Sequence, residues 1–145
     1  MSSVKRPKTP RAALGAFKDD PLAMVNAAIA EAEKADDKAK DNLPLRRAAE
    51  LGWLAASSTA DVLAKRMGHA EPKGANGRRA VLKEVETAGR MKRGTLVIRF
   101  DAAQGILHGD CFHENDEKKC VRERVLDHLE QVKEMVDLAL KDFDE

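Results

Sequence analysis

The chain has 145 residues, of which 35% are charged and only 3% aromatic, and its formal net charge is +1. This length fits one domain with a hydrophobic core of its own. The sequence lacks a run of about 18 apolar residues, so we expect no membrane span. Its two cysteines, Cys111 and Cys120, do not make a disulfide framework, and we predict a cytoplasmic protein with reduced thiols.

The charges are unevenly distributed along the chain. Residues 73–99 contain eight Lys or Arg and two Glu, for a net charge of +6, whereas residues 100–145 contain thirteen acids and six bases, for a net charge of −7. This uneven charge has two interpretations. The basic residues bind an anionic ligand, or they form a solvated face that pairs with the acidic residues of the same fold. The sequence leaves both interpretations open.

Residues 1–18 contain five bases and two prolines with little apolar content, which is typical of a disordered basic arm. We therefore predict a single helical domain over residues 19–145. Its first helix starts where Asp20 provides a cap and Pro21 takes the first helical position.

The second helix is predicted to start near Asn42, with Pro44 in its first turn, and to stop at Gly68. Small residues such as Gly52 and Ala55 occur at its middle, so a neighbouring helix can approach closely there. Trp53 lies one position away from the apolar stripe, and we interpret it as a core or interface residue.

In the second half of the chain we predict a loop over residues 69–77 and a short helix over about 78–92. Two longer helices are predicted over about 95–113 and 117–142. Thr95 is the expected cap of the third long helix. Alternating strand patterns do not occur. The predicted fold is all-α, an antiparallel up-and-down four-helix bundle with one extra short helix.

The segment 107–114 concentrates residues that can carry chemistry. We assign His108, Cys111 and His113 to ligand binding, with a hydrogen bond across the bundle as the alternative role of His108. In an α-helix, His108 and His113 would lie about 140° apart, so they cannot hold one metal ion without a bend. We therefore expect no metal and no cofactor. Cys111 falls on the buried stripe, where thiols are usually inert.

The basic segment is the second candidate site, because it is the only concentrated positive field outside the N-terminal arm. Its bases are expected to meet phosphate groups of a nucleotide or of RNA. The residues assigned to this role are Arg78, Arg79, Lys83, Arg90, Lys92 and Arg93.

Two short segments carry a family resemblance. Residues 47–56, Arg-Ala-Ala-Glu-Leu-Gly-Trp-Leu-Ala-Ala, and residues 107–114, Leu-His-Gly-Asp-Cys-Phe-His-Glu, resemble signatures of the PaREP group of HEPN-like proteins. In the second segment the spacing to Phe112 is one residue longer than in the family pattern, and His113 replaces a tyrosine. The resemblance extends over roughly residues 21–141.

The resemblance implies a helical bundle that often dimerises and that either cleaves RNA or binds a nucleotidyltransferase. The catalytic signature of the cleaving members, Arg followed by His after four to six residues, is met by Arg122 and His128. We expect a non-catalytic, homodimeric binding module for a nucleotide, RNA or a nucleotidyltransferase partner. The alternatives are a metal-independent ribonuclease, with His128 as acid/base and Arg122 stabilising phosphate charge, and a purely structural homodimer.

Overall fold

The structure is a computed structural model that describes residues 20–36 and 42–144, so the predicted arm over residues 1–18 lies outside it. The described residues form helices and no strands, which confirms the all-α class. The elements in chain order are α2 (Pro21–Lys34), α3 (Leu43–Arg66), α4 (Gly74–Ala88), α5 (Val97–Ala102), η2 (Ala103–His113) and α6 (Arg122–Asp144). Among them, η2 is a π-helix that directly continues α5.

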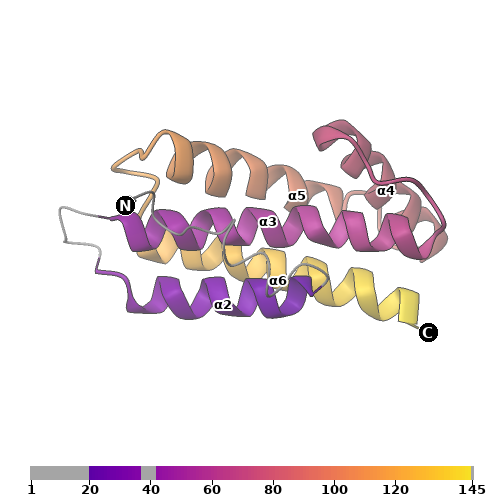
Figure 1. The fold of residues 1–145 in the computed structure, drawn as a ribbon, viewed down its shortest axis with the longest axis horizontal. Helices are drawn as coiled ribbons and strands as arrows, with labels where there is room; N and C mark the ends of the chain where they lie inside the picture. Colours follow the sequence, from indigo (N-terminus) through magenta and orange to yellow (C-terminus); the bar gives the residue numbers. More distant parts are fainter. Residues whose placement is uncertain (1–19, 37–41, 145) are drawn as a thin grey trace, which may run out of the picture.

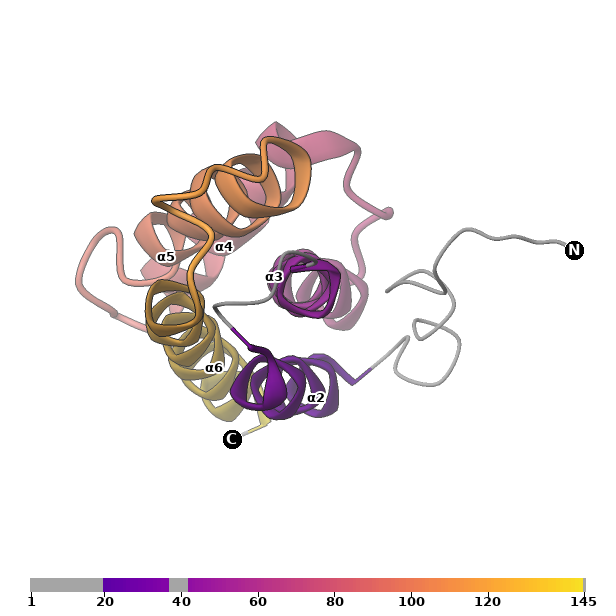
Figure 2. The same ribbon diagram turned by 90° about the vertical axis from the view of Figure 1, so that its left-hand side faces the viewer.

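The helices lie side by side, and the chain reverses its direction from one long element to the next (Figure 1). Seen from the end, α2, α3, α6 and the rod formed by α5 and η2 surround a common interior, as Figure 2 shows. Helix α3 packs against α2, α4, α6 and η2. None of the helices described here combines the length and the apolar content needed to cross a membrane.

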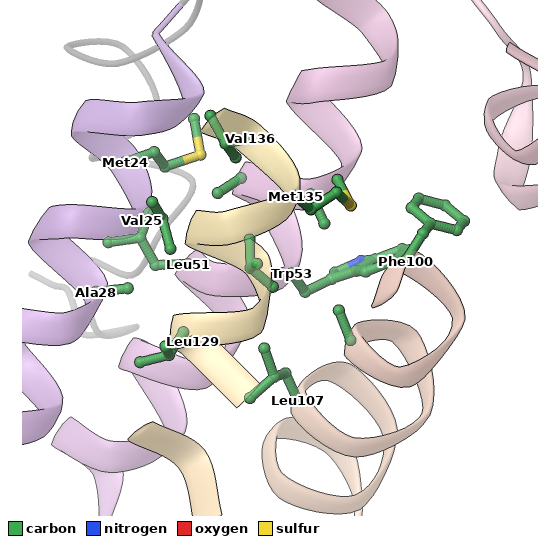
Figure 3. Packing of buried hydrophobic residues seen from close by; sticks show 14 of the residues in the cluster. Met24, Val25, Ala28, Leu51, Trp53, Phe100, Leu107, Leu129, Met135 and Val136 are labelled. Atoms are coloured by element: carbon green, nitrogen blue, oxygen red, sulfur yellow. The ribbon is translucent and has the colours of Figure 1, made fainter. Parts of the chain in front are cut away.

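The core lies where α3 meets its neighbours (Figure 3). The predicted antiparallel packing of the last two long helices is confirmed, with Leu107 of η2 and Val125 of α6 both fully buried. The small residues of α3 permit the expected close approach, because a Cβ atom on Gly52 would overlap Leu129 Cδ2 and lie 3.2 Å from Leu107 Cδ1. Trp53 is 8% exposed and packs against Phe100, so it is a core residue.

The predicted starts of the first two helices are confirmed. The Asp20 side chain accepts a hydrogen bond from the Ala23 amide, and Pro21 occupies the first turn of α2. Asn42 precedes α3, whose first turn includes Pro44. Beyond the end of α3, Gly68 adopts a φ of +78°, a conformation that favours glycine.

The predicted bounds of the short helix are wrong by four residues at each end. Helix α4 begins at Gly74 rather than at Arg78 and ends at Ala88 rather than at Lys92. It ends there because Arg90 adopts a φ of +55°, which an α-helix cannot contain. The segment 89–96 is therefore a turn.

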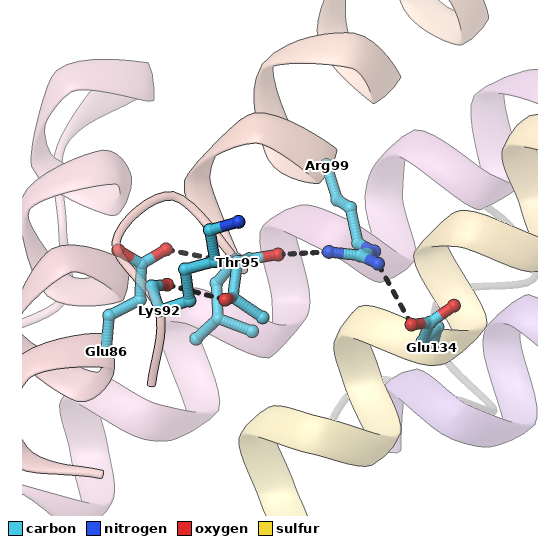
Figure 4. A network of polar contacts seen from close by, with 6 residues as sticks. Glu86, Lys92, Thr95, Arg99 and Glu134 are labelled. Carbon is cyan, nitrogen blue, oxygen red and sulfur yellow. Dashed lines mark hydrogen bonds and ion pairs between the residues drawn. The ribbon is translucent and has the colours of Figure 1, made fainter. Parts of the chain in front are cut away.

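The predicted cap of the following helix is also wrong, because the Thr95 hydroxyl donates to the Lys92 carbonyl instead (Figure 4). The capping group is Glu86 of α4, which is 4% exposed. Its carboxylate accepts backbone hydrogen bonds from Gly94 at 2.9 Å, Leu96 at 2.6 Å and Val97 at 2.9 Å. A negative charge at a helix N-terminus also stabilises the helix dipole.

Helix α6 begins five residues later than predicted. Asp116 holds the preceding turn, since its side chain accepts from the amides of Lys118 and Lys119 and its carbonyl accepts from Cys120. Asp116 thus makes the contacts of a helix cap, but the chain forms only one turn after it, and α6 starts at Arg122.

Replacing Gly52 by Ala should lower the free energy of unfolding by about 1–2 kcal/mol. The added methyl group overpacks a site closed by two buried leucines, and this cost exceeds the gain of about 1 kcal/mol in helix propensity. Urea unfolding followed by circular dichroism measures the change. Gly105→Ala is the matched control, because its methyl group would meet nothing within 4 Å and should not destabilise the protein.

Replacing Glu86 by Ala should lower the free energy of unfolding by on the order of 3 kcal/mol, because two buried amides and one partly buried amide lose a charged acceptor. Glu84→Ala on the same helix serves as the control. Glu84 makes an exposed ion pair with His69, and its loss should cost less than about 0.5 kcal/mol. Equal effects of the two substitutions would contradict the capping role.

Candidate functional site

The two histidines of segment 107–114 come together in the structure. Nε2 of His113 lies 3.1 Å from Nε2 of His108, and the two rings are nearly perpendicular. The expectation that they point about 140° apart is wrong because it assumed an α-helix. In the π-helix η2, hydrogen bonds join residues five apart, so side chains at that spacing become neighbours on successive turns.

A carboxylate of α3 completes this cluster. Glu50 Oε1 lies 2.6 Å from Nδ1 of His108, and the Glu50 side chain is only 13% exposed. The pKa of the Glu50 carboxyl is raised, because burial outweighs the hydrogen bond to His108 and the charges of His108 and His113, which lower it. With Glu50 ionised, Nδ1 of His108 is the donor, and its Nε2 is left as an acceptor for the N–H of His113.

Neighbouring groups fix the orientation of His108. Its ring packs on Trp53 with the centroids 5.4 Å apart and stacks with Phe112 at 6.2 Å. Arg46 of α3 donates two hydrogen bonds to the Phe112 carbonyl, at 3.2 and 2.5 Å, and thereby attaches the end of η2 to α3. Glu50 and His108 are therefore held in place, and His113, the outer member of this carboxylate–imidazole–imidazole chain, is exposed.

Cys111 lies behind this chain and is fully buried, as its position in the stripe predicts. The expectation of reduced thiols is wrong for this structure, in which Cys111 and Cys120 form a disulfide. The bond joins η2 to the turn before α6, and the two Cα atoms are 4.5 Å apart. Cys111 therefore supports the site from inside and has no free thiol to offer a ligand.

The structure divides the predicted phosphate-binding residues into two groups. Arg78 makes two hydrogen bonds to Asp61, at 3.0 and 3.3 Å, and Arg79 pairs with Asp101 at 2.8 Å. Arg99, from the same basic segment, pairs with Glu134 (Figure 4). Three cations of this segment are thus neutralised by acids within the fold, as one of the two interpretations of the charge pattern anticipates.

The other four predicted residues are exposed and make no ion pair within the described part of the chain: Lys83, Arg90, Lys92 and Arg93. They lie on α4 and in the turn before α5. A cavity of about 590 Å³ opens between these two elements. Lys83 and Arg93 line it together with apolar side chains, among them Met91 and Val97.

The two members of the predicted nuclease pair have different described surroundings. The Arg122 guanidinium donates to the carbonyl of Ala35, the residue that follows α2. His128 lies further along α6 and lines a different hollow, next to Ile98 and Arg99. Burial, followed by the charge of Arg124, lowers the pKa of His128, whereas Asp127 raises it.

Reduction of the disulfide should lower the free energy of unfolding by about 2–3 kcal/mol, the value expected for a link across nine residues. Urea unfolding with and without dithiothreitol measures this difference, and a Cys111→Ser/Cys120→Ser variant should be insensitive to the reductant. Mass spectrometry provides an independent check, since the untreated chain should be lighter by two hydrogen atoms. A chain that contains two free thiols after purification in air would contradict the bond.

Comparisons of this chain with protein-family models, with curated proteins and with solved structures gave no match. The function is therefore inferred from the residues and from the geometry of the two sites described above.

Proposed function

We propose that the chain is a non-catalytic helical binding module that holds a phosphate-bearing ligand, a nucleotide or RNA, at the turn between α4 and α5. The observation that supports this proposal is the separation of the basic segment into paired and unpaired cations. Two of the unpaired cations, Lys83 and Arg93, line one cavity, and the other two, Arg90 and Lys92, flank Met91 of the same lining in the sequence.

The cavity offers two kinds of surface. Met91, Val97 and Ile98 contribute apolar area, while Lys83 and Arg93 bring positive charge to the same lining. Ligand pockets commonly combine an apolar lining with a few polar groups that orient the ligand. A nucleotide has this composition, with a flat base for the apolar part and phosphates for the cations.

Glu86 also borders the cavity, yet its charge does not oppose an anion strongly. The carboxylate is buried and accepts backbone hydrogen bonds from Gly94, Leu96 and Val97 at the N-terminus of α5. The positive end of the α5 dipole compensates its charge. The exposed field at this turn is therefore set by the lysines and arginines.

The proposal extends to the architecture and the assembly. We class the fold as an antiparallel up-and-down four-helix bundle with α4 as the extra helix, consistent with the HEPN-like resemblance. We also propose a homodimer or a complex with a nucleotidyltransferase. Ile98, with 67% of its surface exposed, supports a partner at this end of α5, because burial of a large apolar side chain is favourable.

The ribonuclease alternative has less support from the geometry. Arg122 is engaged with the Ala35 carbonyl, and His128 lines a hollow formed with α5. A general acid/base and a phosphate-stabilising group must reach the same substrate, and Arg122 is not among the residues that line the hollow at His128.

Charge reversal tests the phosphate site. Lys83→Glu/Arg93→Glu should weaken binding of a fluorescent single-stranded RNA or of ATP at least tenfold at low salt, because both side chains line the cavity. For RNA, the slope of log affinity against log salt should become shallower by about 1.4, because two phosphate contacts are lost. Fluorescence anisotropy at several ionic strengths provides both quantities.

The matched control is Lys118→Glu/Lys141→Glu, which reverses the same number of charges at exposed positions away from the cavity. This control should retain most of the affinity. If both double variants lose affinity equally, the attraction is non-specific. If the unmodified protein does not bind either probe at low salt, the purely structural homodimer is the better description.

A further inference from the structure

We propose that His108 and His113 form a binding site for a divalent transition-metal ion, which they ligate through their Nε2 atoms. This site lies on η2, separate from the phosphate site at the α4–α5 turn, and does not depend on it. The proposal departs from our expectation from sequence, which excluded a shared metal ion on the basis of α-helical spacing.

The distance between the two nitrogens fits a shared ion. Metal–nitrogen bonds of about 2.0–2.1 Å at a tetrahedral angle place two ligand nitrogens about 3.3 Å apart. The two Nε2 atoms are 3.1 Å apart, so their separation needs to change by only a few tenths of an ångström. His113 must also carry its proton on Nδ1 instead of Nε2, and its ring must turn so that both lone pairs face one ion. The His113 side chain is exposed and can make this adjustment, and an ion can reach the pair from solvent.

Glu50 gives His108 the features of a metal ligand. A histidine that binds a metal through one nitrogen usually donates its other N–H to a carboxylate or carbonyl, which fixes the tautomer and increases the basicity of the ring. Nδ1 of His108 has this partner in Glu50, at 2.6 Å. Packing against Trp53 and Phe112 holds the ring in place, so little entropy is lost when an ion binds.

The ligand types define the class of ion. Imidazole nitrogens suit Zn²⁺, Cu²⁺ and Ni²⁺, whereas Mg²⁺ and Ca²⁺ require oxygen ligands. Within residues 20–36 and 42–144, no group of three or more His, Cys, Asp or Glu side chains is arranged to hold an ion. The protein therefore supplies two nitrogens, and water or an added ligand fills the remaining positions.

Titration of the full-length chain with Zn²⁺ and with Cu²⁺ tests this site. The chain is first stripped of metal and kept free of reductant, because Cys111 and Cys120 would offer competing thiolates if their bond were broken. We expect one ion per chain by competition with a chromogenic chelator, and no binding of Mg²⁺. Cu²⁺ should show nitrogen hyperfine structure from two imidazoles in its electron paramagnetic resonance spectrum.

Three variants assign the ligands. His113→Gln removes an exposed ligand without touching the core and should lower Zn²⁺ affinity at least tenfold, with one imidazole remaining in the Cu²⁺ spectrum. Glu50→Gln should lower the affinity by about 10–100-fold, the usual effect of losing a carboxylate partner of a ligating histidine. His69→Gln is the matched control, since His69 is exposed and has a carboxylate partner, Glu84, but no second imidazole.

Circular dichroism melting in the absence of metal must show that each variant is folded. The proposal is overturned if Zn²⁺ and Cu²⁺ do not bind, if His113→Gln binds them as tightly as the unmodified protein, or if His69→Gln causes the same loss. Binding that disappears only in the Cys111→Ser/Cys120→Ser variant would also overturn it, since the cysteines would then be the ligands.

Discussion

Helix α3 can lie between so many neighbours only because its middle is built of small residues. At Gly52 the side chains of Leu107 and Leu129 close directly over the backbone, so η2 and α6 both approach α3 at this point. The polar contacts depend on that approach. Glu50 is two residues away on the same helix, and it reaches His108 only because η2 lies this close.

The sequence predicts the fold well because its signals are local. Asp20 and Pro21 start one helix, Asn42 and Pro44 start another, and the apolar stripes identify the inward faces. The exceptions arise where a distant group replaces a local one. Thr95 looks like a cap, yet Glu86 takes that role from the preceding helix. A signal for Glu86 did exist, since it lies four residues after the buried Leu82 on the inward face of α4.

The candidate sites could be predicted only in part. The sequence indicates that segment 107–114 contains several side chains that can bind a ligand, and it identifies His108 and His113 among them. It does not select Glu50, which is 58 residues from its partner His108, even though Glu50 belongs to one of the segments that carry the family resemblance. In the basic segment, the sequence cannot distinguish Arg78 from Arg93, because only the tertiary fold places Asp61 beside the former.

The π-helical register of η2 links the backbone to the histidine pair. If residues 103–113 rewound into an α-helix, His108 and His113 would move to different faces, and every residue beyond the change would rotate about the axis. Anything that bridges the two imidazoles must therefore favour the wider winding. By the reciprocity of linked equilibria, whatever stabilises that winding also preorganises the pair. A change in the winding of η2 would therefore change the relative position of His108 and His113, and binding at these two histidines would in turn change the winding.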